Sequence, residues 1–363
     1  MSTIRLVRTL LAGAAAIMLV AVPAAAEDFY KGKAVKIIIN LSAGGTLSIQ
    51  SELFARYWKR HVPGNPDFIV QPMPGGGNTK GIDYVMKSAK PDGLTVGWLG
   101  SSASTRIVGP KSQQVDWSPF YDTAIGANGS GTVMYARKDI VPGITKAVDI
   151  KNAKEIVLGG QDPSSRLDTA GRLAFEMLGI NYRYVTGYKG GAPINAALLR
   201  NEINVHVTPP GAYLARYVDN AINSGVAIPL WYFAAYKSDG TAVEFPELAG
   251  VKSFKEVYQE IKGAPPSGKI WEALKFIADV TEFTSSLVVA PPGTPADRVA
   301  ILRDGFIKTS QDREYLEAAT KQDGMAPTFA NAEQVRNTLK GLASADPGML
   351  DVIKKNIEKY SER

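Results

Sequence analysis

Hydrophobic and polar residues follow each other along the chain in blocks that predict strands separated by helices. Residues 35–39 (V-K-I-I-I) form a short run that is apolar apart from Lys36, which is typical of a strand buried in a parallel sheet. Residues 47–61 then place apolar side chains at helical spacing, and Pro63-Gly64 predicts the end of that helix. The same order continues with a strand at 68–70, a helix at 82–87 and a strand at 94–99. Strands joined through helices pair in parallel with right-handed crossovers, so we expect a doubly wound α/β sheet.

A second series of the same kind predicts a second doubly wound sheet. We predict strands at 132–136, 156–158, 183–185, 203–207 and 228–233, with helices at 168–178, 192–201 and 212–223. Residues 244–268 indicate a loop-rich region, and the predicted elements after it are a helix at 271–280, a strand at 287–290 and helices at 295–308, 311–321, 332–342 and 348–360. The chain is therefore expected to form two α/β lobes with a cleft between them.

The first residues predict export. Arg5 and Arg8 precede an apolar run at 10–22, and the small residues 24–26 offer a cleavage site before Glu27. A run of about 13 residues is short against the ~20 that a membrane span needs. We therefore expect a signal peptide at 1–26, cleavage after Ala26 and a periplasmic mature protein.

Composition narrows the possible functions. The chain has no cysteine, which excludes disulfides, thiolate metal sites and a lipoprotein anchor. Removing the two leader arginines lowers the formal net charge from +6 to +4, and basic residues are scattered among acidic ones. Nucleic-acid binding needs a concentrated basic face, so we expect no nucleic-acid partner. A monomer is expected.

Catalytic signatures are missing. The two histidines, His61 and His206, fall at a helix end and inside a buried strand, and neither G-x-S-x-G nor H-E-x-x-H occurs. Residues 263–269 match most of a P-loop, but Ile270 replaces the hydroxyl residue that would reach magnesium. Residues 75–81 resemble a dinucleotide turn whose third glycine is one place late. We expect no enzyme activity, no cofactor and no metal, although pairing of carboxylates across the fold is not visible in a sequence.

Glycine-rich turns between strands and helices provide the candidate binding site instead. Such turns, at 42–45 and 75–78, allow close backbone approach, and amides at a helix start attract anions. In the second series the turns at 159–165 and 188–191 occupy the same position, and Ser165 with Asp168 has the spacing of a capping box. At the carboxyl ends of parallel strands these turns would face one crevice.

Several motifs together make the chain similar to the receptor family of tripartite tricarboxylate transporters, the Bug-type periplasmic solute-binding proteins. The motifs span nearly the whole mature chain: K-I-I-I at 36–39 running into Gly44-Gly45, H-V-P-G-N-P at 61–66, Q-P-M-P-G-G-G-N at 71–78, K-P-D-G at 90–93, G-Y-K-G-G-A-P at 187–193 and A-P-P-G-T-P-A-D-R at 290–298. The order and spacing of the six segments carry the resemblance.

The resemblance implies a two-lobed periplasmic binding protein of type II-like fold. It divides the chain into a signal peptide (1–26), a first lobe (27–127 and 284–363) and a second lobe (128–283), and it implies that backbone amides, hydroxyls and waters hold a ligand carboxylate. Its first loop usually carries an aspartate where this chain has Ser48, and polar residues are usual where this chain has Thr208-Pro209-Pro210. The candidate ligand-binding residues are Ser42, Ala43, Gly44, Gly45, Thr46, Ser48, Gly76, Gly77, Asn78, Ser101, Ser102, Gly160, Ser164, Ser165, Tyr188, Lys189, Gly190 and Thr208.

The expected function is capture of a small carboxylate-bearing metabolite and its delivery to a membrane permease. Two alternatives stay open at this point. The loaded protein could report to a membrane sensor kinase, or the chain could be a periplasmic hydrolase or lyase that depends on carboxylates. The chain segments that cross from one lobe to the other are expected near 126–131 and 283–286.

Overall fold

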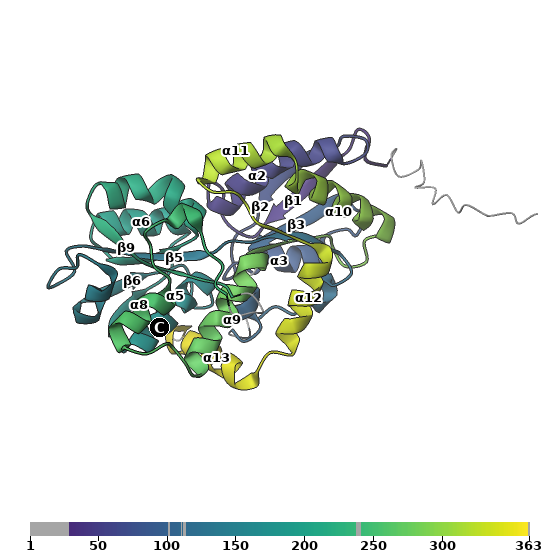
Figure 1. Cartoon of the computed structure of the whole chain (residues 1–363). Helices are drawn as coiled ribbons and strands as arrows, with labels where there is room; N and C mark the ends of the chain where they lie inside the picture. Colours follow the sequence, from purple (N-terminus) through teal and green to yellow (C-terminus); the bar gives the residue numbers. More distant parts are fainter. Residues whose placement is uncertain (1–28, 101, 110, 112–113, 237–240, 362–363) are drawn as a thin grey trace, which may run out of the picture.

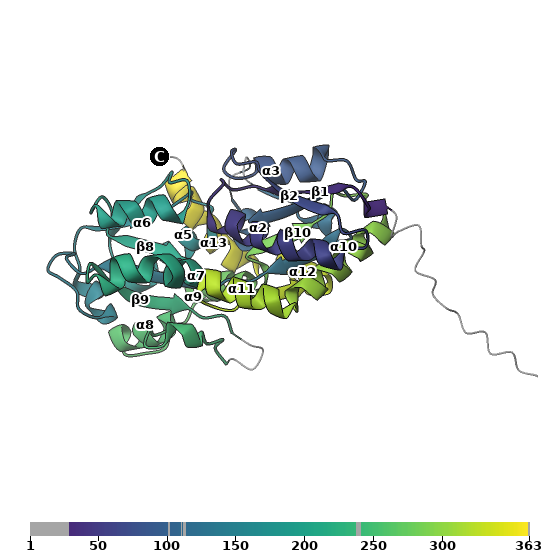
Figure 2. The ribbon, with the colours of Figure 1, turned by 90° about the horizontal axis from the view of Figure 1, so that it is seen from above.

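Two α/β lobes lie side by side in the computed structural model (Figures 1 and 2). The structure describes residues 29–361 except 101, 110, 112–113 and 237–240. Each lobe contains one sheet covered by helices. Within this part of the chain, no helix combines the length and the apolar character that crossing a bilayer requires.

The first lobe holds a six-stranded sheet in the order β11-β4-β10-β3-β1-β2. Its strands are β1 (Ala34–Ile39), β2 (Asp67–Pro72), β3 (Thr95–Gly100), β4 (Ala124–Asn128), β10 (Ser286–Val289) and β11 (Phe329–Asn331). β1 pairs in parallel with β2 and β3, as the alternation of strands and helices predicted. β10 enters from the far end of the chain and runs antiparallel to β3 and β4, so the sheet is mixed.

Helices on both faces of this sheet complete the first lobe. They are α2 (Thr46–Trp58) with a 3-10 turn at Lys59–His61, α3 (Lys80–Asp83) continued by a π turn at Tyr84–Ser88, α4 (Ala103–Arg106), a 3-10 turn at Ser118–Phe120, α10 (Ala296–Ser310), α11 (Arg313–Asp323) and α12 (Ala332–Ala343). Phe54 of α2 packs edge-on against Trp98 of β3, with ring centroids 5.0 Å apart, and Phe306 of α10 joins them. This aromatic cluster fixes α2, and with it the turn that opens α2, against the sheet.

The second lobe holds a five-stranded sheet in the order β7-β6-β8-β5-β9. Its strands are β5 (Thr132–Arg137), β6 (Ile156–Gly159), β7 (Tyr182–Val185), β8 (Val205–Thr208) and β9 (Ala227–Phe233). Its helical elements are a 3-10 turn at Ala147–Asn152, α5 (Arg166–Leu178), α6 (Gly191–Leu199), α7 (Pro210–Ala212) continued by a π helix at Tyr213–Asn223, and a 3-10 turn at Pro246–Leu248. β5 is antiparallel to both β8 and β9, so this sheet is also mixed.

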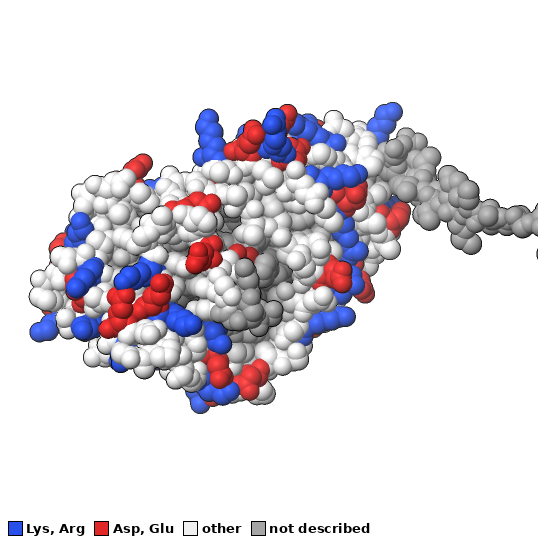
Figure 3. Space-filling model, in the orientation of Figure 1, with Lys and Arg blue, Asp and Glu red and all other residues white. Residues whose placement is uncertain are grey.

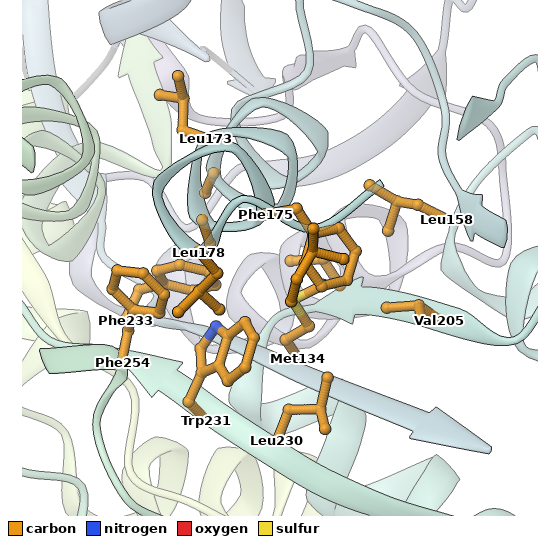
Figure 4. Close-up of a cluster of buried hydrophobic side chains, with 14 of the residues drawn as sticks. Met134, Leu158, Leu173, Phe175, Leu178, Val205, Leu230, Trp231, Phe233 and Phe254 are labelled. Atoms are coloured by element: carbon orange, nitrogen blue, oxygen red, sulfur yellow. The ribbon is translucent and has the colours of Figure 1, made fainter. Parts of the chain in front are cut away.

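The helix α8 (Phe254–Lys262) lies in a region for which the sequence indicated loops. Ser253 caps it through a capping box with Glu256, a signal that the apolar pattern did not reveal. Phe254 is buried, and its ring lies 5.3 Å from that of Trp231 (Figure 4). α8 thus closes one side of the second core.

The last helix, α13 (Pro347–Ser361), lies on the second lobe, whereas we predicted that all of 284–363 completes the first. Met349, Ile353 and Ile357 join the same buried cluster as Phe175 of α5. Tyr360 Oη donates a hydrogen bond to Tyr182 Oη at 2.9 Å, and both views show this helix beside the second lobe (Figures 1 and 2). Its apolar stripe predicts a packed helix but carries no information about which lobe receives it.

Two of the segments that connect the lobes meet at the end of α9 (Lys269–Thr284). The β4–β5 connection crosses at 129–131, where Gly129 N donates to Thr328 O at 2.9 Å and Ser130 N donates to Thr281 O at 3.2 Å. A Cβ on Gly129 would lie 1.6 Å from Glu282 O. Only glycine therefore permits this crossing to pass so close to α9.

Candidate functional site

A cavity of about 160 Å³ lies between the lobes. Its walls are the turn after β1, the start of α4, the turn between β6 and α5, the start of α6 and the end of β8. Ser130 and Ser285, from the two crossings, complete the lining. A second pocket of about 190 Å³ adjoins it through shared residues such as Ser42, Asn78 and Lys189, and it extends to the glycine turn at 75–77.

Many predicted site residues line these two spaces. The cavity is lined by Ser42, Gly45, Thr46, Asn78, Ser102, Ser165, Lys189, Gly190 and Thr208, and the adjoining pocket also by Gly76, Gly77 and Tyr188. They come from both lobes, so the turns singled out in the sequence do face one cleft. Whether these residues contact a ligand stays a prediction.

The remaining predicted residues lie elsewhere. Ala43, Gly44, Ser48, Gly160 and Ser164 line neither space, and Ser101 lies outside the described residues. Ser48 is fully buried on the inner side of α2, and its hydroxyl donates to Glu52 Oε1 at 2.6 Å. The expectation that Ser48 faces the cleft was therefore wrong, because Ser48 lies on the opposite side of α2 from Thr46, Leu47 and Gln50, which line the cavity.

The turn between β6 and α5 does not present free amides, as we had expected. Asp168 Oδ2 accepts from Gln161 N at 2.6 Å and from Asp162 N at 3.2 Å. Asp162 Oδ1 accepts from Ser164 N at 2.9 Å, and a Cβ on Gly160 would lie 2.2 Å from Asp168 Oδ2. Burial raises the pKa of Asp168 to about 7 against the opposing effect of Arg172. The chain's own carboxylates hold this turn.

Arg166, the first residue of α5, is a cavity residue that the sequence reading missed. Its guanidinium is buried and donates to Thr132 Oγ1 at 3.1 Å and to Ser285 Oγ at 2.8 Å. Burial lowers its pKa to about 10, while Glu282 acts in the opposite direction, so the guanidinium stays charged at neutral pH. The sequence did contain a signal for it. A cation in the first turn of a helix interacts unfavourably with the helix dipole, so an arginine at this position indicates a compensating interaction.

Polar contacts between the lobes flank the cavity. The Arg106 guanidinium lies 3.8 Å from Asp162 Oδ2, and Thr105 Oγ1 donates to Ser164 O at 2.6 Å. At another edge Arg216 Nη1 donates to Thr46 Oγ1 at 3.4 Å. The two lobes thus contact each other directly at the margins of the cavity.

The charge of the cavity lining is positive. Arg106, Arg166 and Lys189 contribute cations, whereas Asp162 is the carboxylate among the residues that line the cavity. The outer face shown in Figure 3 differs, because Lys and Arg are intermixed with Asp and Glu on it. An anion would therefore be favoured inside the cleft.

The two histidines lie away from the cavity. His206 is buried, its pKa falls to about 3, and its Nδ1 lies 2.7 Å from Tyr135 Oη. His61 pairs with Asp312 at 2.8 Å on the first lobe, and neither histidine lines the cavity. Within the described residues no group of three or more His, Asp or Glu is arranged to hold a metal.

Comparisons with known proteins agree with this architecture. No protein-family model matches the chain, and no curated protein matches it. Among solved structures, the periplasmic binding protein BugD superposes with a TM-score of 0.66 at 19% identity, covering 90% of this chain and 98% of that one. Rpa4515 from R. palustris, solved with adipate, gives 0.67 at 16% identity, covering 90% and 98%.

A third structure extends the agreement. MatC from Rhodopseudomonas palustris, solved with bound malate, gives a TM-score of 0.60 at 14% identity and covers 91% of this chain and 98% of that one. The similarity runs over both lobes in all three comparisons. The fold implied by the sequence motifs is therefore confirmed, and the chain has the two-lobed fold of the Bug-type periplasmic solute-binding proteins.

Proposed function

We propose that this chain belongs to the receptor family of tripartite tricarboxylate transporters and captures a small carboxylate-bearing metabolite in the periplasm for delivery to a membrane permease. The shared fold supports this function, and so do the adipate and malate bound by two of the structures with that fold. The predicted signal peptide at 1–26 fits the same compartment. The protein binds its ligand without transforming it.

The observation that carries the proposal is the environment of Arg166. This guanidinium is buried at the floor of the cavity, its hydrogen bonds go to two neutral hydroxyls, and no ion pair to it is found among the described residues. Burying a charge without a close counter-ion is unfavourable. A carboxylate entering the cavity supplies that counter-ion and accepts charge-assisted hydrogen bonds from the same guanidinium.

Glu282 does not remove this need for an anion. It is buried on α9 and influences Arg166 electrostatically, but burial raises the pKa of its own carboxyl to about 7. Near neutral pH it is therefore only partly ionised. A strong organic acid in the cavity would be a more complete counter-ion than this side chain.

The experiment is a melting-temperature screen of the mature protein, refolded after denaturation to remove any bound ligand, against mono-, di- and tricarboxylates. A ligand at one hundred times its Kd should stabilise the fold by roughly 2.7 kcal/mol. Mass spectrometry of the released ligand identifies the natural acid and shows that it is unchanged. A panel that never shifts the melting temperature would refute the proposal.

Arg166→Gln tests the site itself. Losing one partner of a buried charge pair costs about 2 kcal/mol or more, so calorimetry should show affinity reduced by at least about thirtyfold. Arg303→Gln is the matched control, because Arg303 also donates to neutral oxygens, those of Ala124 and Asp122, but lies outside the cavity. Equal affinities of the Arg166 variant and the wild type would remove Arg166 from the site.

A further inference from the structure

The last turn of α9 brings a buried carboxyl next to the cavity. Glu282 is only 4% exposed, and no hydrogen bond to its carboxyl is found among the described residues. Ser285, three residues later, continues the helical backbone and accepts a hydrogen bond from Arg166 Nη2. Residues three apart lie on the same face of a helix. Glu282 therefore lies on the side of α9 that carries the contact with Arg166.

Arg166 and Glu282 act on each other without forming an ion pair. Each shifts the pKa of the other in the direction that favours the charged form, yet the hydrogen bonds of Arg166 go to hydroxyls. Both groups also occupy the unfavourable end of a helix, a cation in the first turn of α5 and a carboxyl in the last turn of α9. An anion bound to Arg166 would therefore remove the electrostatic support that Glu282 receives.

The charged groups around Glu282 are few. Arg166 on α5 and Asp279, one turn earlier on α9, are those whose charges act on it among the described residues. The crossing at 129–131, β4 and β11 also pack against α9, and these segments contain no ionisable residue. Arg166 supplies the opposite charge, and Asp279 supplies a like charge that disfavours ionisation of Glu282.

Ionisable residues on the other neighbouring helices are engaged elsewhere. Arg106 of α4 lies 3.8 Å from Asp162, and Asp168 and Arg172 of α5 are hydrogen-bonded to the turn between β6 and α5. α12 and α13 meet α9 through apolar side chains. The ionisation of Glu282 therefore depends on whether Arg166 is available to it.

We propose that Glu282 is an internal counter-ion that competes with the ligand for Arg166, so that capture of a carboxylate is coupled to uptake of a proton from solvent by Glu282. The inference depends on the proposed function, because it concerns the same guanidinium. A ligand carboxylate on Arg166 takes the cation away from Glu282 and adds a like charge nearby, and both changes favour the protonated carboxyl. Glu282 ionises at a pKa of about 7 in the ligand-free protein, so ligand affinity should fall as the pH rises above that value.

The test measures proton uptake and affinity together by calorimetry. The probes are butyrate, malate and tartrate, whose carboxyl groups are all ionised above about pH 6.5. The best binder among them is titrated in buffers of different ionisation enthalpy, because the slope of binding heat against that enthalpy counts the protons taken up. At about pH 7.5 the wild type should take up about half a proton per ligand. Its affinity should fall about tenfold from about pH 6.5 to about pH 8.5.

Glu282→Gln keeps the shape of the side chain and fixes it in a neutral form. This variant should take up no proton, and at about pH 8.5 it should bind the acid about tenfold more tightly than the wild type. A variant that only disturbs packing would not gain affinity. Asp279→Asn is the matched control, because burial also raises the pKa of Asp279, but its carboxylate accepts from Tyr236 N at 2.7 Å. This control should retain the proton uptake.

The outcomes separate the two proposals. If no carboxylate binds the wild type at any pH, the proposed function fails and the proton coupling fails with it. If a carboxylate binds without proton uptake, or if Glu282→Gln leaves the uptake unchanged, the role of Glu282 is refuted while carboxylate capture at Arg166 stands. Proton uptake that Glu282→Gln removes and Asp279→Asn retains supports the coupling.

Discussion

The starts of α2 and α5 follow the same sequence pattern, a strand, a small-residue turn and a helix, yet they differ in chemistry. No acid occupies the first turn of α2, and no side chain caps it. The first turn of α5 contains Asp168, whose carboxylate is bonded to the amides of the preceding turn. Both helix starts line the cavity, and the first lobe contributes an uncapped helix start there, whereas the second contributes the side chain of Arg166. A glycine-rich turn can offer its amides to an anion only where no internal carboxylate already accepts hydrogen bonds from them.

The largest expected effect comes from Asp168→Asn, which removes the carboxylate that distinguishes the start of α5 from the start of α2. The substituted amide cannot accept all the hydrogen bonds that Asp168 Oδ2 receives, from Gln161 N, Asp162 N and Tyr184 Oη. We expect a loss of about 3 kcal/mol in the free energy of unfolding, measured in urea, because a buried donor is left without its acceptor.

A matched substitution in the first lobe checks this interpretation. Asp297 lies in the first turn of α10 and is exposed. Asp297→Asn should change stability by less than about 0.5 kcal/mol, the usual range for an exposed position. Similar losses for the two variants would mean that Asp168 has no special role in holding the turn.

The next largest expected effect is a dependence of folding stability on pH. Burial raises the pKa of Glu282 to about 7, above its ordinary value of 4.5. The folded state then binds more protons than the unfolded state between these two values, so stability should fall as pH rises from about 4.5 to 7. The contribution is at most about 3 kcal/mol.

Glu282→Gln isolates this contribution. Urea titrations at several pH values should show a shallower decline for the variant than for the wild type. Asp168 contributes a slope of the same sign, because its pKa is also raised to about 7, so the decline should be reduced and not abolished. An unchanged slope in Glu282→Gln would contradict the assignment.

The smallest effect concerns Ser48→Asp in the first lobe. Because Ser48 is buried and bonded to Glu52, the new carboxylate would lie next to an existing one. We expect a loss of about 1 to 2 kcal/mol in stability, from like-charge contact and desolvation. Calorimetry on the identified acid should give an unchanged Kd, and a selective loss of carboxylate affinity would return this position to the site.

Periodicity in the sequence predicted most helices and strands because burial imposes it directly. β4 was missed since Ala124–Asn128 is built from small residues with little apolar signal, and α8 was missed because its cap, not its apolar content, marks it. The turns of the cleft were predictable from glycine and position. Arg166 was not, because its partners Thr132 and Ser285 are distant in sequence and meet it only once both crossings are in place.

The placement of α13 has a practical consequence for following closure of the cleft. The described chain starts on the first lobe, where Tyr30 is buried in the core, and it ends on the second, where Tyr360 contacts Tyr182. A donor dye near one end and an acceptor near the other therefore report the separation of the lobes. The sequence contains no cysteine, so two introduced cysteines would be the sole attachment points for the dyes. Single-molecule energy transfer between these dyes could then measure how long the lobes stay together after each binding event.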